Sequence, residues 1–202
     1  MVDTSFTGLA ETGGTYYYFS SGKFATSYSG MVQYGSDWYY VTNGVLKWGV
    51  EGLCNYGGTW YYIKNSKFTP SYSGLYYWQG TWYYLTNGVL KWGVNGVTNY
   101  GGTYYYVNNS QVTFKDTGIA GYNGGYYYFK NSTFDAEYTG LAQYGSDWYY
   151  VTNGVLKWGV NTCVNYGGKW YYVSGSKVDF SYTGYTTYGG HKYYVKNGVV
   201  QV

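Results

Sequence analysis

The sequence has no arginine, one proline, one histidine and two cysteines, and only 10% of its 202 residues are charged. Its twelve lysines are spread among nine acidic residues, which leaves a formal net charge of +3. No basic stripe of the kind that follows a phosphate backbone is present. The charge pattern therefore argues against nucleic acid as a partner.

Long apolar runs are also missing. No segment approaches the roughly 18 to 20 apolar residues that a membrane-spanning helix needs, so we expect no membrane insertion. Residues 1–4 lack the charged and apolar regions of a signal peptide. A cytosolic protein would fit this start, but we favour an excised part of a larger secreted or cell-surface bacterial protein that carries other domains.

Groups able to perform catalysis are scarce. His191 is the sole imidazole, so no Ser-His-Asp or Cys-His set can be assembled around the repeat. Asp135 and Glu137 form the closest acidic pair, which we interpret as solvated coil. No stretch offers enough oxygen ligands for a metal ion. We expect no catalytic residue, metal site or cofactor, and we expect Cys54 and Cys163 to be free buried thiols.

What the chain does have is a 22-residue period marked by a recurring Tyr-Tyr pair, first at Tyr17-Tyr18 and then at Tyr39-Tyr40. A unit this short cannot bury its own apolar face, so copies must stack on their neighbours. We predict an all-β fold, a β-solenoid of nine stacked 22-residue β-hairpin repeats forming a single array over 1–202. The predicted units are 4–25, 26–47, 48–69, 70–91, 92–113, 114–135, 136–157, 158–179 and 180–201.

One unit shows the predicted local structure. Gly30–Tyr34 and Asp37–Val41 are β-prone and flank a turn at Gly35-Ser36, which predicts a hairpin. Asn43-Gly44 then predicts a second reversal with left-handed φ values. Each repeat is therefore expected to be a hairpin followed by a connecting coil.

Alternation along the second strand divides its side chains between two faces. The place of Val41 is always aliphatic or Phe, and the places of Leu46 and Met31 behave in nearly the same way. We predict that these positions share one core, and that Trp38 and Tyr40 lie on the opposite face. An aromatic residue also recurs near the start of each unit. If it lies over the preceding Trp-x-Tyr pair, each junction gains a three-walled aromatic notch.

The sequence resembles the choline-binding, or cell-wall-binding, repeats of Gram-positive surface proteins and their glucan-binding relatives. The likeness rests on Gly57-Gly58-Thr59-Trp60-Tyr61-Tyr62-Ile63 and Gly167-Gly168-Lys169-Trp170-Tyr171-Tyr172-Val173, and it covers the whole chain. It implies hairpins wound into a superhelix with ligands between successive hairpins. It also implies that Trp60 with Tyr62 and Trp170 with Tyr172 form two walls of such sites. The Gly-Trp third wall of that family is replaced here by Trp-Gly or Tyr.

The predicted function is multivalent, non-catalytic binding of a cell-wall polymer or glycan, through choline or sugar, at the cell surface. The candidate ligand-binding residues are Trp38, Tyr40, Trp48, Trp60, Tyr62, Tyr72, Trp82, Tyr84, Trp92, Trp148, Tyr150, Trp158, Trp170 and Tyr172. Asp37 and Asp147 are further candidates for contacts to sugar hydroxyls or a cation. A purely structural stalk is the alternative, because the same rings could serve only to stack hairpins. Ice or mineral binding is a weaker third.

Overall fold

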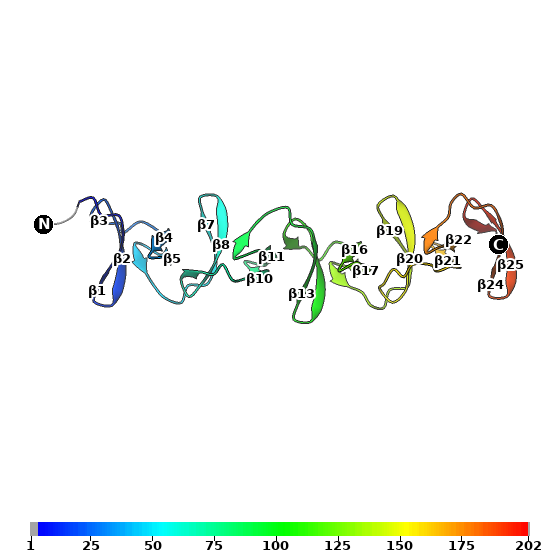
Figure 1. Cartoon of the computed structure of the whole chain (residues 1–202), viewed down its shortest axis with the longest axis horizontal. Helices are drawn as coiled ribbons and strands as arrows, with labels where there is room; N and C mark the ends of the chain where they lie inside the picture. The colour runs from blue at the N-terminus through cyan, green and yellow to red at the C-terminus, as the bar shows by residue number, and fades with distance from the viewer. Residues whose placement is uncertain (1–3, 202) are drawn as a thin grey trace. The chain divides into compact units, whose positions relative to one another are not determined.

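The computed structural model describes residues 4–201, and these residues form strands, turns and loops with no helix among them (Figure 1). The predicted all-β class is confirmed. No helix long and apolar enough to cross a membrane occurs in this range. Met1, on which the expectation of a larger parent chain partly depended, lies outside the described residues.

Two-stranded antiparallel hairpins are the recurring element. The first strands are β1 (Gly8–Thr12), β4 (Gly30–Tyr34), β7 (Gly52–Tyr56), β10 (Gly74–Trp78), β13 (Gly96–Tyr100), β16 (Gly118–Tyr122), β19 (Gly140–Tyr144), β21 (Thr162–Tyr166) and β24 (Gly184–Tyr188). The second strands are β2 (Thr15–Ser20), β5 (Asp37–Val41), β8 (Thr59–Lys64), β11 (Thr81–Leu85), β14 (Thr103–Val107), β17 (Gly125–Lys130), β20 (Asp147–Val151), β22 (Lys169–Ser174) and β25 (His191–Lys196).

A short third strand follows most hairpins. These strands are β3 (Lys23–Phe24), β6 (Val45–Leu46), β9 (Lys67–Phe68), β12 (Val89–Leu90), β15 (Gln111–Val112), β18 (Thr133–Phe134), β23 (Lys177–Val178) and β26 (Val199–Gln201). The strands and turns predicted for residues 30–44 match the structure. Gly35 has φ 63°, and Asn43 and Gly44 have φ 50° and 74°, which are left-handed values that Asn and Gly tolerate best.

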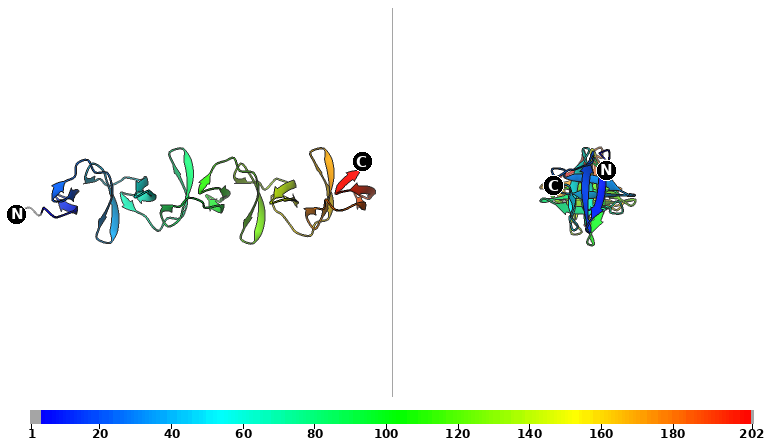
Figure 2. Two further views of the ribbon diagram at one scale, coloured as in Figure 1. Left: turned by 90° about the horizontal axis from the view of Figure 1, so that it is seen from above. Right: turned by 90° about the vertical axis from the view of Figure 1, so that its left-hand side faces the viewer.

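The structure divides into two compact units, residues 1–94 with 109–111 and residues 95–108 with 112–202. Within each unit, successive hairpins project in different directions (Figures 1 and 2). Backbone hydrogen bonds join each hairpin to the turn of the next repeat: the Tyr40 N–H donates to the Ser66 carbonyl over 2.8 Å. The same bond recurs from Tyr18 to Gly44, Tyr62 to Gly88, Tyr84 to Ser110, Tyr106 to Ser132, Tyr128 to Gly154, Tyr150 to Ser176 and Tyr172 to Gly198.

Two kinds of connector lead from one hairpin to the next. In the first kind, which we call a first connector, a glycine closes the turn: the Gly44 N–H donates to the Tyr28 carbonyl over 2.7 Å. A Cβ at Gly44 would lie 2.5 Å from the Ala25 carbonyl oxygen, so this turn requires glycine. The same arrangement occurs at Tyr72 with Gly88, Tyr138 with Gly154 and Tyr182 with Gly198.

In the second kind, which we call a second connector, serine takes the place of that glycine. Ser66 is fully buried, its Oγ accepts a hydrogen bond from the Val50 N–H over 3.1 Å, and its hydroxyl donates to the Lys47 carbonyl. The side chain thus forms hydrogen bonds with two backbone groups of the connector. Ser110, Ser132 and Ser176 occupy equivalent buried places.

Hairpin register assigns the side chains to faces. Met31 is opposite Tyr40 and Val32 is opposite Tyr39, and directly paired residues of antiparallel strands lie on the same face. Met31 therefore shares the face of Trp38 and Tyr40. The prediction that Met31 and Val41 share one core is wrong, although both residues are buried as expected.

The second hairpin, β4 with β5, instead packs on both of its faces. Val41, which is 0% exposed, belongs to a cluster with Leu9 of the preceding hairpin. Met31 belongs to a second cluster with Cys54 and Ile63 of the following hairpin, against which Trp38 and Tyr40 also pack. The Trp-x-Tyr face is consequently an inter-hairpin surface rather than an outer one.

Candidate functional site

The candidate site is the surface where the Trp-x-Tyr strand of one hairpin meets the first strand of the next, which we call a seam. The Trp38 ring lies 5.5 Å from that of Tyr56, centroid to centroid. The equivalent pairs among the described residues are Tyr16 with Tyr34 (5.3 Å), Trp60 with Trp78 (5.1 Å), Tyr104 with Tyr122 (5.5 Å), Tyr126 with Tyr144 (5.3 Å), Trp148 with Tyr166 (5.0 Å) and Trp170 with Tyr188 (5.4 Å). These rings, some half-buried and some exposed, form a ladder that holds neighbouring hairpins together.

The last Tyr of Trp-x-Tyr is covered at some seams. The Tyr62 ring is only 4% exposed and lies 4.7 Å from the ring of Tyr72. Trp60, Tyr62 and Tyr72 therefore pack on one core cluster at the same seam, and that they bind a ligand stays a prediction. Tyr172 is covered in the same way by Tyr182, a residue that the predicted set omitted, with 4.3 Å between ring centroids.

The three Trp residues of the second connectors lie elsewhere. Trp48, Trp92 and Trp158 are 55%, 53% and 61% exposed. The Trp48 ring packs edge-on against Tyr39 at 5.9 Å, and no ring contact of the described residues joins it to Trp38 or Tyr40. Trp92 packs in the same manner on Tyr83 and Trp158 on Tyr149, and the Trp158 ring also lies edge-on to Tyr126 at 6.0 Å. Among the ring contacts of the described residues, none places these three rings over the Trp-x-Tyr pair of the preceding repeat, as a third wall would require. That they contact a ligand stays a prediction.

The remaining predicted residues occupy half-buried positions. Trp82 lies 5.2 Å from the Tyr77 ring of its own hairpin, and Tyr84, two residues further along the strand, is half-buried. Trp148 and Tyr150 pack against a core cluster of Leu141, Val173 and Val178.

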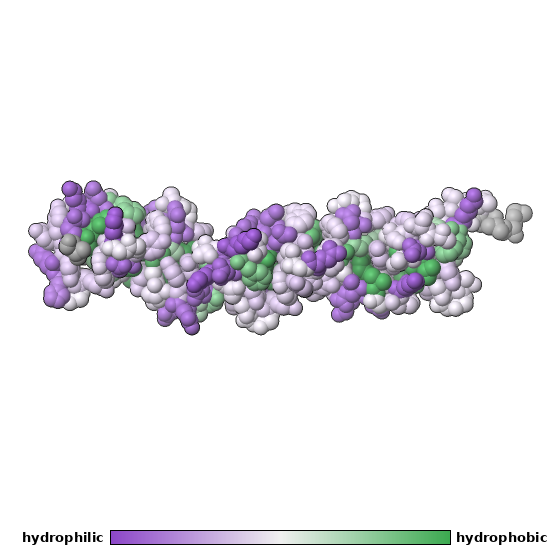
Figure 3. Space-filling model, turned by 180° about the vertical axis from the view of Figure 1, so that it is seen from behind, coloured by the Kyte–Doolittle hydropathy of each residue, from purple (hydrophilic) through white to green (hydrophobic). Residues whose placement is uncertain are grey.

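Hollows occur beside some of these rings. On the face shown in Figure 3, hydrophobic side chains form separate patches rather than a continuous surface. A cavity of about 410 Å³ runs from Tyr40 past Gly52 to Trp60 and Trp78, and Glu51 contributes a carboxylate to its wall. Glycine at Gly52 leaves room for the indole, because a Cβ there would lie 3.2 Å from Trp78 Nε1.

A second cavity, of about 300 Å³, lies beside Tyr106 and Phe129 and has Asp116 in its wall. Burial alone would raise the pKa of Asp116, but hydrogen bonds from Thr113, Asn108 and Ser132 outweigh it and hold that pKa below its usual value. Asp116 is therefore ionised at neutral pH.

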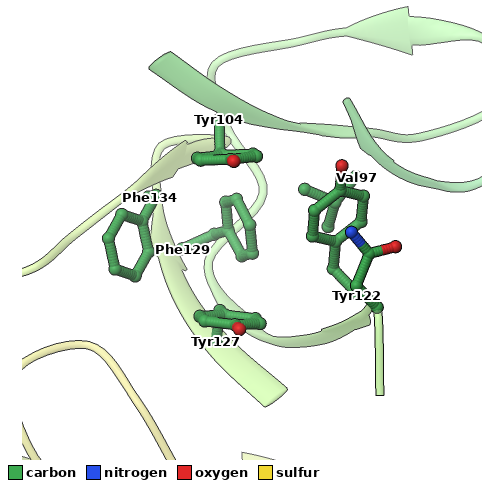
Figure 4. Close-up of a pocket in the computed structure, with 7 residues that line it drawn as sticks. Val97, Tyr104, Tyr122, Tyr127, Phe129 and Phe134 are labelled. Carbon is green, nitrogen blue, oxygen red and sulfur yellow. The ribbon is translucent and has the colours of Figure 1, made fainter. Parts of the chain in front are cut away.

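A third cavity, of about 200 Å³, is almost wholly aromatic. Its lining is Val97, Tyr104, Tyr122, Asn123, Tyr127, Phe129 and Phe134. Figure 4 shows Tyr104 and Tyr127 on either side of Phe129, with Tyr122 opposite. The lining carries no charged side chain, so this cavity offers ring faces without a counter-ion.

Asp37 and Asp147 are engaged by lysine. The Lys67 ammonium lies 2.8 Å from Asp37 Oδ2, and Lys177 forms the same contact with Asp147. The hydrogen bond to Asp37 is the main cause of the raised pKa of Lys67. Both pairs are exposed and connect a strand to the next repeat, so the structure assigns these carboxylates an ion-pairing role rather than an open binding position.

Other sequence-level candidates are accounted for by burial. Cys54 and Cys163 are buried free thiols, which confirms that prediction, and burial raises the pKa of Cys54 to about 11. His191 is exposed in β25. Among residues 4–201, no group of three His, Cys, Asp or Glu side chains is arranged to hold a metal ion.

Sequence reasoning missed several seam residues. The last residue of the first strand is aromatic in successive hairpins, as at Tyr34, Tyr56 and Trp78, and this 22-residue recurrence was visible in the sequence. The repeats in which Tyr replaces Trp, which include Tyr106 and Tyr128, were also left out of the predicted set. Their equivalence in the hairpin register shows that they belong to it.

A family model described as the choline-binding repeat matches residues 5–23, 27–47, 49–68, 71–91, 137–157, 159–179 and 181–201. No curated protein matches the chain. Among solved structures, choline binding protein F from Streptococcus pneumoniae in crystal form II is 23% identical over 93% of this chain and 61% of that one, with a TM-score of 0.35.

Two further structures of that protein are similar. Its complex with ipratropium is 23% identical over 93% of this chain and 63% of that one, with a TM-score of 0.32. Its structure in the presence of a peptidoglycan analogue, a tetrasaccharide-pentapeptide, is 24% identical over 98% of this chain and 58% of that one, also with a TM-score of 0.32. The chain thus spans about three fifths of the length of these structures.

Proposed function

The chain belongs to the choline-binding repeat family, and from that premise we propose that it is a non-catalytic module that binds choline-bearing cell-wall polymer at the bacterial surface. We further propose that its hairpins stack as a β-solenoid of nine 22-residue repeats, so that several weak sites act together on one polymer. Other domains of a longer chain would then be held at the cell wall.

One observation carries this proposal: the cavity beside Tyr40 combines aromatic faces with a carboxylate. Its wall contains Tyr40, Trp60 and Trp78 together with Glu51, and no lysine. A quaternary ammonium gains about 0.5 to 2 kcal/mol from each ring face it meets, depending on desolvation, and a nearby carboxylate adds Coulomb attraction. A neutral sugar would gain the stacking but not the charge attraction.

The cavity beside Tyr106 repeats the combination in the other unit. Asp116 supplies the carboxylate there, and Phe129 a second ring. Two similar sites on one chain support binding to a polymer, because a second contact on a tethered ligand forms at high effective concentration. Each site alone is open and shallow, which fits weak affinity for free choline.

Retention on choline-coupled resin tests the function. The wild-type chain is expected to bind the resin and to elute with free choline, and Tyr40→Ala should elute at a lower choline concentration. Tyr77→Ala is the matched control, since Tyr77 is 54% exposed and is not among the residues lining that cavity.

The alternative is a structural stalk whose rings only stack hairpins. The ring ladder at the seams favours this alternative, because Trp38 and Trp60 each contact a ring of the following hairpin. Under it, neither choline resin nor peptidoglycan retains the wild-type chain, and that result contradicts the binding function. Retention by a choline-free glucan but not by choline resin would instead indicate a sugar ligand.

A further inference from the structure

Four tyrosines of the first connectors lie against the last Tyr of the preceding Trp-x-Tyr segment or its Tyr-rich equivalent. The Tyr138 ring is stacked on Tyr128 with 3.6 Å between centroids and 15° between planes. The other pairs are Tyr28 on Tyr18 (4.5 Å), Tyr72 on Tyr62 (4.7 Å) and Tyr182 on Tyr172 (4.3 Å). An aromatic ring of the chain itself thus covers the ring face at these seams.

These covering rings are held in place. The Tyr138 hydroxyl donates to the Leu141 carbonyl over 2.5 Å, and a Cβ at Gly140 would lie 3.2 Å from that hydroxyl oxygen. The Tyr28 hydroxyl donates to the Met31 carbonyl over 2.8 Å in the same way. Hydrogen bonding at the ring's polar end and stacking on its face fix each tyrosine in the seam.

Seams that follow a second connector lack this cover. Among residues 4–201, no aromatic pair places a ring on Tyr40, because Trp48 packs on Tyr39 instead. Tyr40 lines the cavity that contains Glu51, and Tyr106 lines the one that contains Asp116. The Phe129 ring lies 6.1 Å from that of Tyr106 and is tilted by 47°, so it is not stacked on Tyr106 as Tyr138 is on Tyr128. The hollows therefore lie where the covering tyrosine is missing.

We propose that Tyr28, Tyr72, Tyr138 and Tyr182 are built-in occupants of the four seams that follow a first connector, which close those seams to ligand and leave the seams at Tyr40 and Tyr106, where the cavities lie, as the quaternary-ammonium sites. This inference rests on the proposed function, and it specifies which seams perform it. A cation bound by ring faces needs an uncovered face, and at Tyr128 that face is already in van der Waals contact with Tyr138.

The number of choline molecules bound per chain tests the inference. Equilibrium dialysis of the full chain with radiolabelled choline gives this number for the wild type. Tyr138→Ala uncovers Tyr128 and is expected to raise it by one. Tyr138→Phe keeps the covering ring and is expected to leave it unchanged. Tyr40→Ala is expected to lower it by one.

The outcomes separate the two claims. A wild-type chain that takes up no choline contradicts the proposed function, and this inference with it. If the wild type binds choline but Tyr138→Ala gains no site while its circular dichroism stays native, the inference alone is wrong. If Tyr138→Ala does not fold, the test uses two other variants, Tyr182→Ala in the last described seam and Tyr40→Ala. The number of choline molecules that each of them binds per chain then decides. Unchanged numbers in both overturn the inference.

Discussion

The Tyr62 hydroxyl donates a hydrogen bond to Glu51 Oε1 over 2.8 Å, which fixes a carboxylate in the wall of the cavity shared by Tyr40 and Trp78. This bond satisfies a phenol that is only 4% exposed. It also orients the negative charge that we expect a quaternary ammonium to meet. The hydrogen bond therefore stabilises the seam at Tyr62 and also positions a negative charge in the cavity beside Tyr40, at the neighbouring seam.

Glu51→Gln separates charge from hydrogen bonding. The amide oxygen still accepts the Tyr62 hydroxyl, so the melting temperature should change little. Loss of the charge near an exposed cation should weaken choline binding at this site by about 1 kcal/mol, or roughly fivefold. Titration of the variant and the wild type by tryptophan fluorescence measures this. Equal affinities at low salt would contradict a role for the carboxylate.

Ser66→Ala tests the second connector. Ser66 is 0% exposed, and its hydroxyl bonds both the Val50 N–H and the Lys47 carbonyl. Removing the hydroxyl breaks both of these part-buried hydrogen bonds, so the free energy of unfolding should fall by about 1 to 3 kcal/mol. Urea denaturation gives the value. The exposed Ser36→Ala is the control and should be neutral within about 0.5 kcal/mol.

Gly44→Ala tests the first connector. Gly44 has φ 74°, and a Cβ would lie 2.5 Å from the Ala25 carbonyl oxygen. The clash adds to the usual strain of a left-handed residue, so destabilisation should exceed the roughly 1 to 3 kcal/mol expected from strain alone. Gly35→Ala is the matched control, because Gly35 has φ 63° with no atom within 4 Å of the added Cβ. Equal losses in the two variants would show that the contact with Ala25 is unimportant.

Local structure was predictable from the sequence because it depends on nearby residues. The turn residues Gly35 and Asn43 have the left-handed φ values that their types favour. Alternation along Asp37–Val41 correctly separated Trp38 from Val41. The burial of Val41 followed from its aliphatic character in every repeat.

Contacts between hairpins were harder to predict. The 22-residue spacing says that residues are equivalent, but not which neighbour covers which face. Met31 was assigned to the wrong face because its hairpin partner, Tyr40, was not considered. Trp48 and Tyr72 were treated alike as third walls, yet the two connectors place Trp48 on Tyr39 and Tyr72 on Tyr62. The sequence did distinguish these two residues, because Trp48 is the first residue of its predicted unit and Tyr72 is the third.

The stability of the chain should fall at alkaline pH. Burial, followed by the charges of neighbouring groups, raises the pKa of Tyr138 to about 12, and burial raises that of Cys54 to about 11. A group whose pKa is higher in the folded than in the unfolded state binds more protons when folded. Its stabilising contribution is complete below the unfolded value and is lost as the pH rises through the folded value.

The affected window therefore begins near pH 9 to 10 and extends to about 12. Urea midpoints measured at pH 7, 9 and 11 should be similar for the first two and lower for the third. Tyr138→Phe removes one of the ionising hydroxyls. It should be less stable than the wild type at pH 7, because the bond to the Leu141 carbonyl is lost, but it should lose less stability between pH 9 and pH 11. An equal or steeper loss in this variant would show that the Tyr138 hydroxyl does not contribute to the alkaline transition.

Asp37→Asn tests whether the exposed aspartates have a role in binding. Asp37 is paired with Lys67 at 2.8 Å, and both side chains are about two fifths exposed. Exposed pairs contribute about 0 to 1 kcal/mol, so the unfolding midpoint should change little. Choline affinity should be unchanged, because neither residue is among those lining the cavity beside Tyr40. Asp147→Asn provides a matched variant in the other unit, where Lys177 is the partner. A marked loss of binding in both variants, with the fold intact, would mean that these carboxylates leave their lysines to contact the ligand.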